Sequence, residues 1–414
     1  MSTATAVGLR CRECGTEYAD NPINVCEMDF APLEVMYDYD AAKKVLSRET
    51  ITKRAFNMWR YKELLPEQEP VSGFNTGGTP LYHAKNLGKR LGGFENLYVK
   101  FDGVCVPTLS FKDRVVAVSI ARAKRFGFET VGCASTGNLA NSVAAQAAQA
   151  GLKSVILIPN SLERAKVVNT QVYGATLIKV DGHYDDVNRL CAEIANDAKI
   201  GIVNVNLRAY YAEGSKTMGF EVAEQLGWRA PDNVVVCMAG GSLINKLNKA
   251  FNEFSKLGLL EHEPKCKFWG AQATGCNPIT AAIKAGTDLI KPVKEPNTIA
   301  RSIAIGNPAD GYFAARLCQE SGGGGDDVTD EEIVAGMRLL AETEGVFTET
   351  AGGVTVATFK KLAEAGKINP DETTVLCITG QGLKTMDALM EPGVLPDAPV
   401  IKPTLSAFKD LNVA

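Results

Sequence analysis

The pattern of apolar and polar residues changes at about Val71, where short β-branched runs begin to alternate with longer segments of helical period. Most of the short runs are continuously apolar rather than alternating, which is typical of strands covered on both faces. The predicted strands are residues 130–136, 154–159, 175–180, 201–206, 233–241, 267–273 and 374–380. The predicted helices between and after them are residues 139–150, 162–173, 185–198, 209–226, 243–256 and 331–343.

This alternation predicts an α/β protein with doubly wound, mostly parallel sheets. The number of strands favours two sheets, and therefore two domains with a cleft between them. We interpret the glycine-rich stretch 321–330 as a flexible loop that ends at a helix start, because Thr329 is followed three residues later by Glu332. Residues 1–70 differ from the rest: they hold a small cysteine cluster and then a charged, helical-looking segment at 41–61.

Composition narrows the function classes. The formal net charge of -4 is mixed along the chain without a basic block, so nucleic acid is a poor partner. No apolar run approaches the ~18 residues of a membrane span, and we expect no signal peptide and no membrane partner. The 11 cysteines are an odd number scattered over a long chain, which indicates reduced thiols and a cytoplasmic protein. With only 3 histidines, histidine-rich metal sites and histidine-based triads are disfavoured.

Strand-to-helix turns are the places to search for chemistry, because ligands of such folds bind at the carboxyl ends of the strands. The turn after the 130–136 strand places Ser135, Thr136 and Gly137 at a helix start, where backbone N–H groups form a cradle for a carboxylate or phosphate. The alternative is an ordinary helix cap, since turns of this composition are common.

Two further turns between a strand and a helix could also bind a ligand. The turn 238–246 matches neither a dinucleotide fingerprint nor a Walker loop, yet Ala239 to Leu243 would present free N–H groups suited to a single phosphomonoester. In the turn 377–384, Thr379 ends a strand, where its hydroxyl could hydrogen-bond a ring nitrogen in the cleft. The alternative for the turn 238–246 is a tight turn whose glycines serve packing. The alternative for the turn 377–384 is a surface turn whose polar groups are all hydrogen-bonded within the protein.

Lys112 lies in the sequence PTLSFKDRVVAVS, at the predicted start of a helix and among apolar residues. The positive end of a helix and partial desolvation both favour a neutral amine, which Schiff-base chemistry requires. A lysine, a phosphate cradle, a carboxylate cradle and a hydroxyl at a strand end together fit one cofactor, pyridoxal phosphate.

Six motifs carry a family resemblance, and they occur in the family's order over nearly the whole chain. They are TGGTPLYHAKNLGKRLG (76–92), SFKDR (110–114), ASTGN (134–138), IAIGNP (303–308), TETAGG (348–353) and TGQGLK (379–384). The chain resembles the threonine synthases, which are fold-type II pyridoxal-phosphate enzymes with a fold similar to the tryptophan synthase β subunit. The resemblance implies a homodimer with a Cys-containing leader at 1–70, a large cofactor-binding domain at 71–110 plus 220–414, and a smaller inserted α/β domain at 111–219.

Carried over to this sequence, the resemblance assigns Lys112 to the Schiff base and Asn138 to the cofactor's phenolic oxygen. It assigns Thr379 to the ring nitrogen and the turn 135–137 to the substrate carboxylate. Ala239, Gly240, Gly241, Ser242 and Leu243 would hold the cofactor phosphate. Two departures stand out: Gln381 replaces a histidine that many members have, and the phosphate turn reads Ala-Gly-Gly-Ser-Leu.

The implied reaction is that of a carbon–oxygen lyase, which converts O-phospho-L-homoserine and water to L-threonine and phosphate. Lys112 would remove the Cα proton and shuttle the Cβ proton. The candidates for binding the leaving phosphate are Arg114, Lys100 and Arg301, which the sequence alone does not rank. We place Arg114 at the substrate because it lies nearest to Lys112; the alternative for Arg114 is a charge on the helix surface.

Other functions remain open from the sequence. A paralogue of the same fold could act on another amino acid, as cysteate synthase and serine or threonine dehydratases do. A non-catalytic protein on a degenerate enzyme fold is disfavoured because Lys112, Asn138 and Thr379 occur together. A nucleotide-binding Rossmann protein is disfavoured because no dinucleotide fingerprint follows a strand.

The leader contains Cys11, Cys14 and Cys26 with Asp29 at the fourth position of a zinc-ribbon spacing. Three thiolates and a carboxylate can bind zinc, but a structural site usually has a second Cys-x-x-Cys pair. The alternative is a degenerate ribbon held by packing, and on the sequence alone we assign no metal ligands. In either case we expect the leader to lie outside the chemistry.

Overall fold

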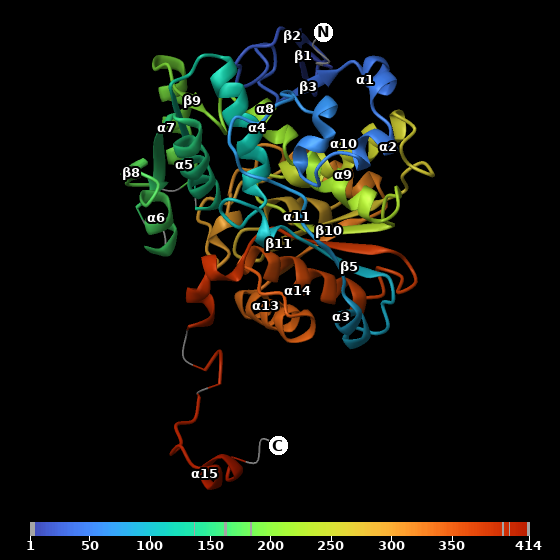
Figure 1. The fold of residues 1–414 in the computed structure, drawn as a ribbon, viewed down its shortest axis with the longest axis vertical. Coiled ribbons are helices and arrows are strands. Elements are labelled where there is room, and N and C mark those ends of the chain that lie inside the picture. The colour runs from blue at the N-terminus through green and yellow to red at the C-terminus, as the bar shows by residue number, and fades with distance from the viewer. Residues whose placement is uncertain are drawn as a thin grey trace.

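The computed structural model of the chain describes residues 5–135, 137–160, 164–182, 184–390, 393–396 and 398–411. Three sheets organise these residues (Figure 1). No helix in the described ranges is both long and apolar enough to cross a membrane.

The largest sheet has six strands in the order β12-β11-β10-β13-β5-β4. Four of the five pairs of neighbouring strands are parallel, and β4 is antiparallel to its neighbour β5. The strands are β4 (Leu81–His83), β5 (Leu97–Phe101), β10 (Asn233–Cys237), β11 (Lys267–Ala273), β12 (Gly324–Val328) and β13 (Thr374–Ile378). Every residue of β10 and β13 is buried, as the continuous apolar runs predicted for strands covered on both faces.

Helices cover both faces of this sheet, with α13 and α14 on the opposite side from α9 and α10 (Figure 1). Alternate residues of β10 point to the two sides: Val234 packs with Phe251 and Phe254, whereas Val235 packs in a cluster with Phe359. The helices of this part are α3 (Lys85–Arg90), α9 (Lys216–Gln225), α10 (Ser242–Lys256), α11 (Pro278–Lys284), α12 (Gly311–Glu320), α13 (Asp330–Glu344) and α14 (Thr350–Glu364).

The second sheet has four parallel strands in the order β8-β7-β6-β9. Its strands are β6 (Thr130–Ala134), β7 (Lys153–Pro159), β8 (Thr176–Val180) and β9 (Gly201–Ile202). The helices around it are α4 (Lys112–Arg125), α5 (Asn138–Ala150), α6 (Arg164–Gln171), α7 (Tyr184–Asp197) and α8 (Arg208–Glu213). All four strands fall within the predicted inserted domain 111–219, although the domain boundaries themselves stay a prediction.

The N-terminal residues form a small antiparallel sheet in the order β2-β1-β3, with β1 (Ala6–Cys11), β2 (Glu17–Tyr18) and β3 (Leu33–Tyr37). The helical-looking segment that follows is three short pieces, α1 (Tyr39–Val45), α2 (Arg48–Thr52) and the 3-10 helix η1 (Met58–Leu64). The segment is interrupted because the Ser47 and Asn57 side chains each cap a new helix start.

Short elements complete the chain. The remaining 3-10 helices are η2 (Asp102–Val104), which follows β5, η3 (Arg301–Ile303), between α11 and α12, and η4 (Gly382–Lys384) and η5 (Met386–Leu389), which follow β13. The C-terminal helix α15 (Leu405–Lys409) extends away from the body of the molecule (Figure 1).

Two sequence-based predictions are wrong in detail. The glycine-rich stretch is not a flexible loop, because its residues 324–328 form β12 and pair along β11. The predicted helix 209–226 is two helices, α8 and α9, which meet at Gly214. A Cβ on Gly214 would lie 2.4 Å from the Arg114 carbonyl oxygen, so the chain bends where it packs against α4. The predicted cap of α13 is confirmed, since Thr329 and Glu332 form a reciprocal capping box.

Candidate active site

One cavity of about 350 Å³ lies at the carboxyl ends of strands from both parallel sheets. Ala134 and Ser135 follow β6, the residues from Cys237 to Leu243 follow β10, and Thr379 follows β13. The three turns in which the sequence predicts ligand-binding groups thus all line this one cavity. This agrees with the rule that ligands of parallel α/β sheets bind at the carboxyl ends of the strands.

Lys112 lines this cavity from the first position of α4, as the sequence predicted. Its Nζ donates a hydrogen bond to the Tyr211 hydroxyl at 3.0 Å and lies 4.6 Å from the centre of the Phe111 ring. The backbone N–H of Phe111 donates to the Thr379 carbonyl at 2.9 Å. This bond ties the start of α4 to the end of β13, so the amine and the Thr379 hydroxyl are held on neighbouring walls.

Thr379 is buried, and its hydroxyl lies 3.6 Å from Cys237 Sγ at the end of β10. Burial raises the pKa of the Cys237 thiol to about 11, so the group beside Thr379 is neutral near pH 7. A ring nitrogen placed here would therefore meet an uncharged hydroxyl rather than a carboxylate.

The turn from Ala239 to Leu243 lines the cavity between β10 and α10. Gly241 adopts φ +88°, a conformation that favours glycine, and a Cβ there would lie 2.8 Å from the Asp310 carbonyl oxygen. Next to it, a Cβ on Gly240 would meet open space. The first N–H groups of α10 have no intrahelical acceptor, so this turn offers them to an anion at the positive helix end.

Ser135 and Asn138 line the opposite wall at the start of α5. The Ser135 hydroxyl accepts hydrogen bonds from the N–H groups of Gly137 and Ala140, at 3.0 and 2.9 Å, which makes it a helix cap as well as a cavity residue. Thr136, the central residue of the predicted carboxylate cradle, lies outside the described residues.

The Asn138 side-chain amide donates to both carboxylate oxygens of Glu349 at 2.9 Å. Its Oδ1 is buried and has no hydrogen-bond partner in the part of the chain that the structure describes. Glu349 itself lines the cavity from the start of α14. The amide has two N–H bonds, so it could donate one to a phenolic oxygen while the other stays on Glu349.

The placement of Arg114 at the substrate is wrong. Its side chain is fully buried outside the cavity lining, where it forms ion pairs with Asp102 and Glu221 at 2.6 Å each. Lys100 belongs to the same buried network, with its Nζ 2.7 Å from Glu221. Arg301 does not line the cavity either. None of the three cations proposed for the leaving phosphate contributes to the cavity wall.

Among the described residues, the cation that lines the cavity besides Lys112 is Arg208, at the first position of α8. Its guanidinium contacts Asp310 at 2.7 Å, and Asp310 also lines the cavity. Burial disfavours the charged carboxylate, but Arg208 and Arg12 outweigh that effect and lower the pKa of Asp310. Sequence reasoning missed Arg208 and Tyr211 because both lie on a helix that follows the two-residue strand β9 rather than a glycine-rich turn.

The expectation that the leader lies outside the chemistry also needs correction. Asn24 and Val25 of the leader line the cavity. Arg12 contacts Asp310 at 3.3 Å and Asn245 at 3.3 Å, beside the turn from Ala239 to Leu243. The leader thus contributes to the cavity wall near the turn from Ala239 to Leu243.

The residues fit the expected cofactor, pyridoxal phosphate. The cavity holds an amine for its aldehyde, a positive helix end with an open glycine for its phosphate, and a neutral hydroxyl for its ring nitrogen. Two buried polar atoms on the cavity wall, Asn138 Oδ1 and Ser302 Oγ, have no hydrogen-bond partner among the described residues. Unpartnered buried polar atoms are costly in a finished structure, so their position favours a polar ligand.

Comparisons with known proteins agree with this geometry. The sequence profile of the family described as pyridoxal-phosphate dependent enzyme matches residues 74–380. The chain is 40% identical to a threonine synthase of Methanocaldococcus jannaschii over 391 residues, which cover 94% of this chain and 95% of that protein. It is 39% identical to a threonine synthase of Methanosarcina acetivorans, with coverage of 94% and 95%.

Solved structures share the fold. Diaminopropionate ammonia lyase from Escherichia coli superposes with a TM-score of 0.66 at 19% identity, covering 84% of this chain and 94% of that chain. Threonine deaminase isoform 2 from Solanum lycopersicum gives 0.61 at 20% identity, covering 76% and 88%. The chain therefore belongs to the family of pyridoxal-phosphate-dependent enzymes, in the group of the threonine synthases.

Proposed function

We propose that the chain is a threonine synthase, which converts O-phospho-L-homoserine and water to L-threonine and phosphate. The observation that carries the proposal is the convergence of Lys112, Thr379 and the turn after β10 on one cavity in a chain 40% identical to a named threonine synthase. Pyridoxal phosphate, when bound, supplies the electron sink that stabilises negative charge developing on the substrate carbons.

The residues of the chain have separate tasks in this reaction. The turn from Ala239 to Leu243 would hold the cofactor phosphate through backbone N–H groups, and Lys112 would hold the cofactor at its aldehyde. The Lys112 amine would take the proton from Cα and move the proton at Cβ. The Tyr211 hydroxyl, 3.0 Å from this amine, orients it towards the substrate carbons.

Arg208 is our candidate for the phosphate of the substrate. It is the guanidinium on the cavity wall, and a guanidinium can bind a phosphate through two parallel hydrogen bonds. Asp310 fixes the direction of this side chain at 2.7 Å. The substrate phosphate would replace the Asp310 carboxylate as a partner of the Arg208 guanidinium.

A change of Arg208 tests this assignment. Arg208→Ala should lower kcat/KM for O-phosphohomoserine about 10- to 100-fold, because a charge-assisted hydrogen bond contributes ~1.5–3 kcal/mol. It should also weaken inhibition by inorganic phosphate. Arg189→Ala is the matched control, since Arg189 is an exposed arginine of α7. An unchanged KM and unchanged phosphate inhibition would place the substrate phosphate elsewhere.

The decisive experiment is phosphate release from O-phosphohomoserine by the purified protein, with amino-acid analysis of the product. Threonine formed in equal amount with phosphate supports the proposal. A protein that carries the cofactor but releases no phosphate contradicts it, and phosphoserine with sulfite and then serine or threonine would be tested next. Those substrates correspond to cysteate synthase and to the dehydratases.

We further propose that the enzyme is a cytoplasmic homodimer without a nucleic-acid partner. All eleven cysteines are outside disulfide bonds, and ten of them are buried, a usage typical of a reducing compartment. Light scattering of the purified protein measures the assembly, and a monomer at working concentration would contradict the dimer.

A further inference from the structure

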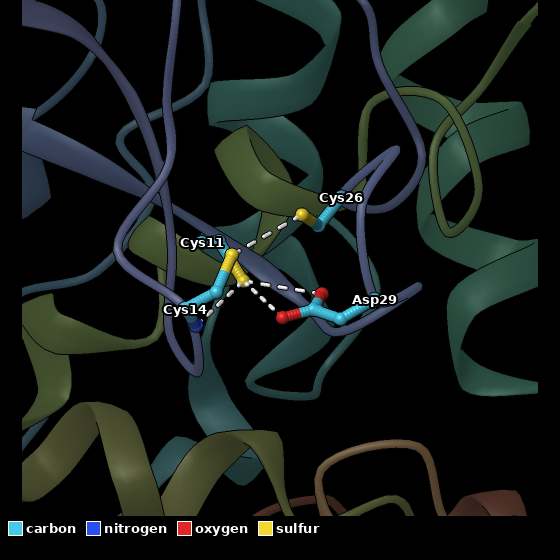
Figure 2. A group of neighbouring side chains, drawn as sticks. All are labelled: Cys11, Cys14, Cys26 and Asp29. Carbon is cyan, nitrogen blue, oxygen red and sulfur yellow. Dashed lines mark hydrogen bonds between the residues drawn. The ribbon is translucent and has the colours of Figure 1, made fainter.

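The leader holds a cluster of potential metal ligands that the proposed reaction does not use. Cys11 ends β1, Cys14 follows in the turn to β2, and Cys26 and Asp29 lie in the loop before β3. The three sulfur atoms and a carboxylate oxygen lie within 4.8 Å of one another, and Figure 2 shows the side chains pointing toward a common centre. Residues up to 18 positions apart therefore meet through the fold of the small sheet.

Two ligand pairs in this cluster, Cys14 with Cys26 and Cys11 with Asp29, have distances that match the edges of a tetrahedral zinc site. With Zn–S near ~2.3 Å and Zn–O near ~2.0 Å, a tetrahedron has S···S edges of about 3.8 Å and S···O edges of about 3.5 Å. The Sγ atoms of Cys14 and Cys26 are 3.7 Å apart, and Cys11 Sγ lies 3.4 Å from both carboxylate oxygens of Asp29. These ligand pairs need almost no movement to share one ion.

Backbone hydrogen bonds already hold the ligand atoms in place. The N–H groups of Glu13 and Cys14 both donate to Cys11 Sγ at 3.4 Å, and the N–H of Met28 donates to Cys26 Sγ at 3.3 Å. In both turns the amide two residues after the cysteine is a donor. Such outer hydrogen bonds orient the ligands of metal sites and stabilise their negative charge.

The alternatives explain the cluster less well. A disulfide between Cys14 and Cys26 would need sulfur atoms ~2.05 Å apart and would leave Cys11 and Asp29 without a role. Without an ion, the Cys11 thiol donates to the Asp29 carboxylate at 3.4 Å, and no Lys or Arg of the described residues pairs with Asp29. A divalent cation would take the place of the thiol protons and supply the positive charge that the carboxylate lacks.

We propose that Cys11, Cys14, Cys26 and Asp29 bind one zinc ion in a closed tetrahedral site. Thiolates select a borderline-soft ion such as zinc over magnesium or calcium. Four protein ligands leave no open position, so the ion is structural rather than catalytic. The zinc ion would take no part in the proposed reaction, so this metal site is a separate property of the protein.

The position of the site suggests what the ion does. Arg12 lies between two of the ligands, contacts Asp310 at 3.3 Å and lies 3.8 Å over the Phe313 ring. The N–H of Asp310 donates to the Gly240 carbonyl at 2.9 Å, in the turn that holds the cofactor phosphate. Asn24, two residues before Cys26, lines the cavity. The ion fixes the loops that carry Arg12 and Asn24 to this end of the active site.

The first test is metal content of the purified holoenzyme by inductively coupled plasma mass spectrometry. We expect about one zinc per chain in the wild type and a loss to below about a tenth in Cys26→Ser and Asp29→Ala, as removal of a ligand from a closed site implies. Glu27→Gln is the matched control, because Glu27 is an exposed carboxylate beside Cys26 that is not among the four ligands. The control should retain its zinc.

The second test needs no destabilised variant. Cobalt-loaded wild type should show the ligand-field absorption of tetrahedral cobalt and thiolate charge transfer, and Asp29→Cys should keep the ion and strengthen the charge-transfer band. Zinc should protect Cys14, the exposed ligand cysteine, from a thiol reagent, and a chelator should remove that protection.

Three outcomes would overturn the zinc site. They are wild type without stoichiometric zinc, zinc retained equally by the ligand variants, and a Cys14–Cys26 disulfide found by mass spectrometry. Each is independent of threonine formation, so the zinc site and the proposed reaction can fail separately.

Discussion

At the scale of single residues, the cavity depends on one amine. Lys112 begins α4, and its Nζ is held by the Tyr211 hydroxyl while Phe111 ties the helix start to β13. These contacts hold the amine in the cavity wall, close to the uncharged hydroxyl of Tyr211. Two substitutions separate the amine from the hydroxyl that orients it.

Lys112→Ala should lower kcat by about 10³-fold or more, because the nucleophile and the proton-transfer group are lost together. The variant should still retain the cofactor, because the turn from Ala239 to Leu243 is unchanged. Phosphate release and the visible absorbance of the bound cofactor measure the two effects. Lys89→Ala, at an exposed lysine of α3, is the control, and normal turnover by Lys112→Ala would remove this lysine from the mechanism.

Tyr211→Phe should lower kcat about 10- to 100-fold with little change in KM, because a hydrogen bond to a charged or reacting group contributes ~1.5–3 kcal/mol. The ring that packs beside Lys112 remains, so the change removes only the hydroxyl that accepts from Nζ. Steady-state kinetics with Tyr82→Phe as an exposed control measure it. An equal effect in both variants would mean that the Tyr211 hydroxyl does not orient the amine.

At the scale of elements, a buried ion network fixes α4 against the large sheet. Arg114 of α4 contacts Asp102, which follows β5, and Glu221 of α9. Lys100 of β5 also contacts Glu221. The network therefore joins the helix that carries Lys112 to two elements of the large sheet's domain.

Arg114→Ala should reduce the free energy of unfolding by about 3–5 kcal/mol, because it leaves two buried carboxylates with too few partners. Arg125→Ala, at an exposed position on the same helix, should cost less than ~1 kcal/mol. Urea denaturation of the cofactor-loaded proteins compares the two. A cost for Arg114→Ala as small as that of the control would mean that Lys100 alone neutralises Glu221.

The sequence predicts an element or a residue's role well when the evidence for it lies in neighbouring residues of the chain, and poorly when it depends on distant partners. Lys112 and Thr379 were predicted because each lies at a strand or helix end that its own neighbours define. β12 was missed because its sequence, GGDDV, has no apolar run; it is an edge strand that pairs with β11 alone. The role of Arg114 could not be predicted, because the partner Glu221 lies 107 residues away in the sequence.

At the scale of the whole molecule, buried ion pairs make stability depend on pH. Burial disfavours the charged form of Glu221, but Arg114 and Lys100 outweigh it and lower its pKa below the ordinary value of 4.5. The pKa of Glu213 is lowered in the same way by Lys216, Lys246 and Lys249. In both cases the unfolded chain takes up protons first as the pH falls.

The stability from these carboxylates is therefore present above about pH 5 and is lost progressively as the pH falls below the ordinary pKa of glutamate, ~4.3. The urea midpoint of the wild type should fall between pH 6 and pH 3. Glu221→Gln should start from a lower stability and fall less steeply, because one of these protonations is absent. Parallel slopes in the two proteins would show that Glu221 does not contribute to acid unfolding.

The contact between Arg12 and Asp310 has a consequence for the order in which the protein is made. The two residues are 298 positions apart, so the leader leaves the ribosome long before its binding surface exists. The ligands from Cys11 to Asp29 are close in sequence and can gather as soon as they emerge. During synthesis we expect the leader to fold locally before the residues that it contacts near the active site have been made. It completes the wall of the active site only after α12 has been translated, so nascent chains shorter than this cannot assemble the cavity.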